Sequence, residues 1–179
     1  MGVDPGTNFT GYGIITIRGK EILCEAIGYI DLSKMTDTYQ KLRHIFERVS
    51  GIIEAYHPHE VAFESPFYGE NVQSMLKLGR AQGVAMAAAL TQGLPVFEYA
   101  PRKVKAAITG NGAASKEQVA SLLCRQLKIK QFPTNLDSTD GLAVAVCHYY
   151  ESSSPLAGGG GSVKSWKEFV AKNAKRIKE

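Results

Sequence analysis

Short apolar segments separated by turn residues fill the first 32 positions of the chain, a pattern typical of β-strands. A strand stub is expected at residues 1–7, where Pro5-Gly6 makes a tight turn, and a second strand at residues 11–17. Arg18-Gly19-Lys20 then supplies a hairpin turn before a third strand at residues 22–32. The chain is therefore expected to begin as an antiparallel meander.

From Asp37 the apolar residues recur at steps of three and four, which predicts an amphipathic helix that ends before His57-Pro58. Five elements are expected to follow: a strand at 60–64, a helix at 73–92, a strand at 94–99, a short helix at 101–108, and a helix with a Ser115/Gln118 capping box. A last helix, from Ser138, is almost wholly apolar, and such helices are normally buried.

The domain organisation follows from a change in composition near residue 152. Residues 1–151 are expected to form one domain, and the Ser-, Pro- and Gly-rich residues 152–164 a flexible linker. Residues 165–179 carry Trp166 and Phe169 on one side, with lysines around them. They predict a basic amphipathic helix.

Composition narrows the classes of protein to consider. The 179 residues, 44% hydrophobic and 21% charged, suit one globular domain with a real core. No apolar run approaches the roughly 20 residues that a bilayer requires, and no secretory leader is recognisable, so we expect a cytoplasmic protein with no membrane partner. The three cysteines lack a zinc or disulfide spacing. The net charge of +4 permits a polyanionic partner without requiring one.

Four acids stand at the ends of predicted elements. Asp4 and Glu64 each close an apolar strand, where sites form in open α/β sheets. Asp137 and Asp140 are three residues apart at the start of the last helix. For these two, simple helix capping is an adequate explanation when they are taken alone. The two strand-end acids favour a shared site instead.

A cluster of four carboxylates requires protonation, basic partners or divalent cations to offset its repulsion. Carboxylate oxygens select Mg²⁺ or Mn²⁺ over zinc. Two such ions about 4 Å apart can activate water and stabilise the leaving oxygen in phosphodiester hydrolysis. The predicted order of strands and helices, with acids at these places, is that of nucleases with the ribonuclease H-like fold, an α/β fold with a mixed five-stranded sheet flanked by helices.

Lys116 and two glycines depart from local rules. Lys116 is expected at the first position of a helix, beside the positive end of the helix dipole. Such a violation is found at functional sites, although a solvated lysine explains it equally well. Gly79 and Gly83 lie one turn apart within a helix, which indicates close approach to the sheet or to a second subunit.

Several segments, in order along residues 1 to about 150, resemble the RuvC family of bacterial Holliday-junction resolvases. They are Gly-Val-Asp-Pro-Gly-Thr (2–7), Phe-Glu-Ser-Pro-Phe (63–67), Leu-Lys-Leu-Gly-Arg-Ala-Gln-Gly-Val (76–84), Val-Lys-Ala-Ala-Ile-Thr-Gly-Asn-Gly (104–112), Ser-Lys-Glu-Gln-Val (115–119) and Asp-Ser-Thr-Asp-Gly-Leu-Ala-Val-Ala (137–145). Gly141 stands where the family more often has Ala, which costs a little helix propensity.

The resemblance implies a function and a set of site residues. It implies a homodimeric, Mg²⁺-dependent endonuclease, with Mn²⁺ as a substitute, that resolves four-way DNA junctions by paired nicks beside the RuvA–RuvB branch-migration complex. The metal ligands implied are Asp4, Glu64, Asp137 and Asp140. The DNA-binding residues implied are Phe67, as an aromatic that stacks on an unpaired base, with Tyr68, Arg80, Lys105 and Lys116.

Three alternatives stay open from the sequence alone. The Asp4-Pro5-Gly6-Thr7 turn also occurs as the phosphate loop of sugar kinases and actin-like ATPases, which need two such domains. A junction-binding protein without cleavage retains the basic and aromatic residues but leaves the four acids unexplained. The smaller resolvase-like YqgF group shares the fold and fits the segment 76–84 less well.

Overall fold

The computed structural model describes residues 1–66, 71–129 and 135–153. The strands are β1 (Gly2–Asp4), β2 (Phe9–Arg18), β3 (Glu21–Asp31), β4 (Val61–Glu64) and β5 (Val96–Tyr99). The helices are α1 (Thr38–Tyr56), α2 (Val72–Leu90), α3 (Pro101–Thr109), α4 (Lys116–Gln126) and α5 (Asp137–Ser153). All the elements expected in residues 1–153 are present, so the order predicted from the sequence is confirmed.

The five strands form one mixed sheet in the order β3-β2-β1-β4-β5. The antiparallel meander β1-β2-β3 is confirmed, and β4 and β5 are added parallel to β1. Strands β1, β3, β4 and β5 consequently run in the same direction, and their C-terminal ends meet at one edge. We call this edge, where β1 and β4 end, the carboxyl edge.

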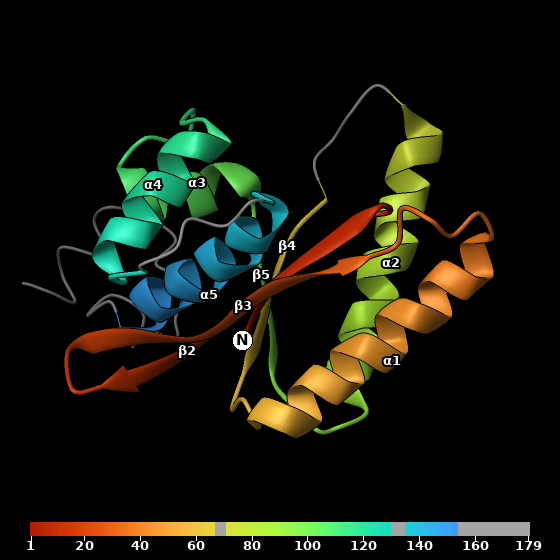
Figure 1. Ribbon diagram of the computed structural model, residues 1–179, viewed down its shortest axis with the longest axis horizontal. Coiled ribbons are helices and arrows are strands. Elements are labelled where there is room, and N and C mark those ends of the chain that lie inside the picture. The colour runs from red at the N-terminus through yellow and green to blue at the C-terminus, as the bar shows by residue number, and fades with distance from the viewer. Residues whose placement is uncertain (67–70, 130–134, 154–179) are drawn as a thin grey trace, which may run out of the picture.

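Helices cover both faces of the sheet (Figure 1). The alternation of side chains along β4 divides the core: Val61 and Phe63 pack with α1 and α2, whereas Ala62 packs with α4 and α5. Helix α5 is almost wholly buried from Ser138 to His148, as its apolar sequence predicts. None of the described helices is long and apolar enough to cross a membrane.

Glycines let α5 lie directly against the backbone of the sheet. A Cβ atom on Gly141 would lie 2.5 Å from Tyr12 Cα, a distance that real side chains do not adopt. Gly11 and Gly13 of β2 face the backbone of α5 at similarly short range. The sequence interpretation of Gly141 as a small loss of helix propensity is therefore incomplete, because the residue permits this contact.

Gly79 and Gly83 behave differently. A Cβ atom at either position would meet no atom of the described residues within 4 Å. Of the two explanations that the sequence left open, close packing on the parent sheet is therefore wrong. Both glycines lie on the exposed side of α2.

The end of α5 differs from the sequence prediction. Ser152 and Ser153, which were expected to begin a flexible linker, are the last residues of α5. Ser152 Oγ donates to the Tyr149 carbonyl at 3.1 Å, which satisfies an acceptor in the last turn of the helix. The remaining expected linker and the basic helix at 165–179 lie outside the described residues.

Candidate active site

The carboxyl edge brings the predicted acids together. Asp4 ends β1 and Glu64 ends the neighbouring parallel strand β4, in register with each other because Val3 pairs with Phe63. Helix α5 begins beside them with Asp137. These three acids line one cavity of about 250 Å³, together with the turn that follows β1.

The acids interact electrostatically. Burial, followed by the charge of Asp140, raises the pKa of Asp4 to about 7. Burial and the charge of Asp4 raise the pKa of Glu64 to about 8. Burial also raises the pKa of Asp140, although the neighbouring Lys116 opposes that shift. Ionisation of all four acids at once is therefore unfavourable in the protein alone.

Lys116 is the nearest cation to the acids of α5. Its Nζ atom lies 2.5 Å from Asp140 Oδ2 and 3.3 Å from Asp137 Oδ1. Partial burial lowers the pKa of Lys116, but the hydrogen bond to Asp140 and the surrounding acids outweigh burial and raise it. The unusual cation at the start of α4 thus has carboxylate partners at the start of α5, and half of its side chain is still exposed.

Lys105 of α3 provides a second positive charge. The half-buried lysine lowers the pKa values of Glu64 and Asp140, against the stronger effect of burial. Two lysines from different helices therefore flank the acids on the α3 and α4 side of the edge.

The donor set suits a hard divalent cation. Four clustered carboxyl groups, whose joint ionisation the protein alone does not favour, provide the oxygen ligands that Mg²⁺ and Mn²⁺ prefer. In this structure Asp137 and Asp140 are paired with Lys116. Among the described residues, no group of three Asp, Glu, His or Cys side chains is close enough to hold a metal ion. The residues fit a metal by type and placement, and the ligand assignment stays a prediction.

Gln82 of α2 was missed by the sequence analysis. Its buried amide lines the same cavity and donates to Glu98 Oε1 at 2.7 Å and to the Glu64 carbonyl at 3.4 Å. It thereby ties α2 to the ends of β4 and β5. An amide on the apolar side of an otherwise alanine-rich helix was the signal that could have found it.

The far end of α5 is fixed by a polar chain. His148 is buried, and its Nε2 lies 2.7 Å from Glu60 Oε2, while its Nδ1 lies 2.8 Å from the Tyr99 hydroxyl. Glu60 precedes β4 and Tyr99 ends β5. This network and the glycine contacts hold α5, and with it Asp137 and Asp140, in one position on the sheet.

Comparison with known proteins decides the family. Residues 1–148 match the family model described as "Crossover junction endodeoxyribonuclease RuvC". The chain belongs to the RuvC family. Its members are metal-dependent nucleases. The alternative that the turn at Asp4 is the phosphate loop of a sugar kinase or an actin-like ATPase is therefore wrong.

Relatives of the RuvC family match nearly the whole chain. The Bacteroides fragilis protein is 55% identical over 180 residues, which cover 99% of this chain and 95% of the relative. The Porphyromonas gingivalis protein is 54% identical over 181 residues, with 99% and 96% covered. Both carry the name "Crossover junction endodeoxyribonuclease RuvC".

The structure described as "T. thermophilus RuvC in complex with Holliday junction substrate" has a TM-score of 0.78 at 30% identity and covers 84% of this chain and 92% of its own. The yeast mitochondrial resolvase Ydc2 has a TM-score of 0.62 at 12% identity over 82% of this chain and 75% of its own. The latter likeness concerns the fold alone. The ribonuclease H-like α/β fold expected from the sequence is confirmed.

The sequence also predicts DNA contacts for Arg80, Phe67 and Tyr68. Arg80 is exposed on α2, and its expected contact with DNA stays a prediction. Phe67 and Tyr68 lie outside the described residues, so their expected contacts also stay predictions.

Proposed function

We propose that this protein cleaves four-way DNA junctions by phosphodiester hydrolysis, with Asp4, Glu64, Asp137 and Asp140 as its metal ligands. The observation that carries the proposal is the meeting of these acids at one edge, where the pKa values of Asp4 and Glu64 rise to about 7 and 8. Carboxyl groups that hold protons near neutral pH without a cation release them when a divalent ion binds.

Two Mg²⁺ ions, or Mn²⁺ in their place, would supply an activated water and a charge that stabilises the leaving oxygen. The protein residues have their own tasks. Glu64 and Asp4 are held by adjacent parallel strands, and Asp137 and Asp140 by a helix that cannot slide. Rigid placement of this kind keeps the scissile phosphate in line with the attacking group.

Lys116 and Lys105 are proposed to bind the DNA backbone beside the scissile bond. In the free protein Lys116 partly neutralises Asp137 and Asp140. Because half of the Lys116 side chain is exposed, its ammonium group can turn to a phosphate once cations bind the acids, and there it stabilises the negative charge that develops. Arg80 and Tyr68 are proposed as further DNA contacts, and Phe67 as the aromatic that stacks on an unpaired base.

We further propose a homodimer formed through α2. Val72, Leu76 and Leu90 are exposed by 59%, 51% and 60%. With Gly79 and Gly83 they recur at steps of three, four and seven, which is an apolar stripe suited to a partner helix. A twofold dimer presents two sites to a twofold substrate, as two matched incisions require.

The cellular setting is proposed by family likeness. Like other members of the RuvC family, the protein is proposed to act in DNA recombination and repair in the cytoplasm of a bacterium. The RuvA–RuvB branch-migration complex is the expected partner on the same junction.

The test is incubation of the protein with a synthetic four-way junction and Mg²⁺, with each labelled strand resolved separately. We expect paired nicks in two opposing strands of like polarity, with ends that a ligase can rejoin. Tight junction binding without any nick at saturating Mg²⁺ would instead favour the junction-binding alternative.

A further inference from the structure

A second cavity, of about 170 Å³, lies at the carboxyl edge on the α1 and α2 side of the sheet. Its polar lining comes from the turn after β1, the connection from β3 to α1, and both helices. These polar residues are Thr7, Asn8, Thr36, Thr38, Lys41 and Lys77. We call it the two-lysine cavity.

The two-lysine cavity is a direct neighbour of the cavity lined by the acids. One turn borders both: Pro5 and Gly6 face the acids, and Thr7 and Asn8 face the lysines. Helix α2 also borders both, since Gln82 lines one cavity and Lys77 the other. A single extended strand of nucleic acid can therefore span the two.

The cavity has an excess of positive charge. Among the described residues, neither Lys41 nor Lys77 forms an ion pair with a carboxylate. Lys41 Nζ donates to the Thr7 carbonyl at 2.8 Å and to Asn8 Oδ1 at 3.3 Å, so its charge is held at the cavity wall without being neutralised.

The two acids near this connection are engaged elsewhere. Asp31 accepts hydrogen bonds from the Ser33 amide and hydroxyl, and Asp37 accepts one from the Gln40 amide at 2.7 Å as the N-cap of α1. Neither acid lines the cavity. Two lysines and three threonines thus line the cavity with no anionic partner among the described residues, and ammonium and hydroxyl groups are the donors that an oxyanion requires.

We propose that the two-lysine cavity binds a backbone phosphate of the DNA strand being cut, a short distance along the strand from the scissile bond. This inference rests on the proposed function. The four acids repel a polyanion, and the lysines so far assigned to DNA near them lie on α3 and α4. Lys77 and Lys41 supply the corresponding attraction on the opposite side of the edge, so that the strand is held on both flanks of the reacting bond.

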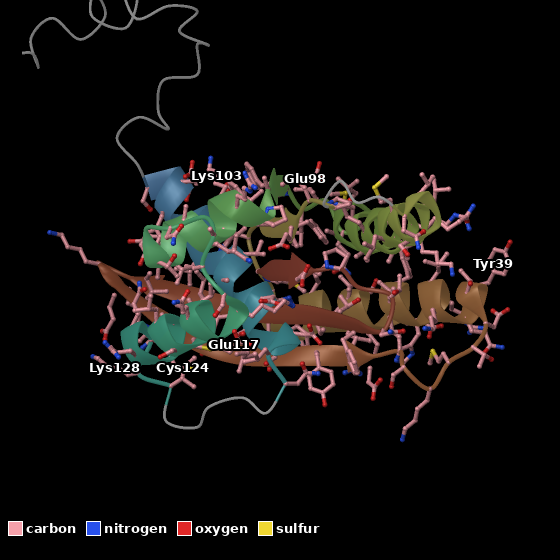
Figure 2. The ribbon with its side chains drawn as sticks, turned by 90° about the horizontal axis from the view of Figure 1, so that it is seen from above. Tyr39, Glu98, Lys103, Glu117, Cys124 and Lys128 are labelled. Atoms are coloured by element: carbon pink, nitrogen blue, oxygen red, sulfur yellow. The ribbon has the colours of Figure 1, made fainter. Side chains whose placement is uncertain are left out.

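Lys77→Gln is the primary test variant, because Lys41 also supports the turn after Asp4. The matched control is Lys128→Gln, which removes one positive charge from the turn after α4. Figure 2 shows Lys128 at the opposite end of the long axis from Tyr39, which follows the cavity residue Thr38 in the first turn of α1. Lys128 is 83% exposed and contacts Glu21 at 3.3 Å, so its loss should leave the fold intact.

The measurement is binding to a four-way junction in EDTA across a salt series, followed by phosphate ethylation interference. For Lys77→Gln we expect affinity to fall roughly fivefold to tenfold, and the slope of log K against log salt to shrink by about 1, relative to Lys128→Gln. One phosphate near the cleavage position should lose its interference signal.

Equal affinities and slopes for Lys77→Gln and Lys128→Gln would overturn the proposal. The proposal would also be overturned if the cavity bound only free phosphate. In that case phosphate would raise the melting temperature of the wild type but not of Lys77→Gln, and the two proteins would bind the junction equally tightly. The binding assay contains no metal and does not depend on cleavage. If the wild-type protein failed to nick junctions in Mg²⁺, the proposed function would be wrong, but the binding comparison would still test the two-lysine cavity.

Discussion

Lys116 Nζ of α4 lies 2.5 Å from Asp140 Oδ2 of α5, so the first turns of two helices face each other across an ion pair. The Asp140 side chain is only 13% exposed, whereas the Lys116 side chain is 50% exposed. The acid is therefore fixed in the protein, and the lysine can leave it. Lys116 therefore balances part of the charge of Asp137 and Asp140 from a side chain that solvent can reach.

Lys116→Ala should reduce the rate of cleavage more than the affinity for the junction. The lysine is available to stabilise charge that develops on the phosphate, and removal of one such donor costs on the order of 100-fold in rate. Single-turnover rates at saturating protein measure this loss. A rate restored to the wild-type value by high protein concentration would show that Lys116 only binds backbone.

Without divalent cations, the acids at the carboxyl edge should make stability fall as the pH rises. The folded pKa values of Asp4 and Glu64, about 7 and 8, exceed the unfolded values near 4, so the folded state binds more protons. Their stabilising contribution is complete below pH 4 and is lost as the pH rises through 7 and 8.

The Met1 amine has the opposite effect, because burial lowers its pKa to about 6 and its folded state binds fewer protons. The comparison that isolates the acids is therefore wild type against Asp4→Asn, with melting temperatures measured in EDTA from pH 5 to 9. We expect the wild type to lose more stability than the variant over this range, and Mg²⁺ to reduce the difference. Parallel curves for the two proteins would contradict the electrostatic account of the edge.

Gly141→Ala should destabilise the protein by about 1 to 3 kcal/mol, the usual cost of overpacking a close contact. The added Cβ atom would displace α5 from Tyr12 and move Asp137 and Asp140 with it. Gly51→Ala in α1 is the matched control, because its Cβ atom would meet nothing within 4 Å and should stabilise the helix by up to about 1 kcal/mol. Urea denaturation measures both, and similar midpoints would refute the close-packing argument.

Gly83→Arg should give folded monomers that no longer make paired incisions. The position faces open space in the chain itself, so the large side chain fits the monomer and obstructs only a partner helix. Sedimentation and strand-resolved cleavage test this together. An unfolded variant, or a dimer with normal paired cuts, would remove α2 as the interface.

The sequence sufficed to predict the elements, because these depend on local patterns, and to place the four acids at element ends, while the resemblance to the RuvC family implied that they share one site. Periodicity located the helices, and the Ser115 capping box is present with both of its hydrogen bonds. The close contact of α5 with the sheet was not predicted. Gly11, Gly13 and Gly141 are uninformative until the tertiary partner of each is known, since a strand glycine also fits a bulge or a bend.

Lys116 and Gln82 also have partners that the sequence did not identify. Lys116 was noticed because it violates a helix rule, but its partners Asp137 and Asp140 follow it by more than 20 positions and could not be assigned from local sequence. The amide of Gln82 on the apolar side of α2 is a signal in the sequence, but its contact with Glu64, 18 positions earlier, became visible only in three dimensions.

The most direct test of the central claim is strand-resolved cleavage of a four-way junction in Mg²⁺ by Asp4→Asn, Glu64→Gln, Asp137→Asn and Asp140→Asn, with junction binding measured in parallel. Each variant should lose cleavage and bind the junction as tightly as the wild type or more tightly, because each removes a metal ligand and a charge that repels phosphate. Nicking near the wild-type rate by any two of the four variants would contradict the assignment of these carboxylates as the metal-binding site.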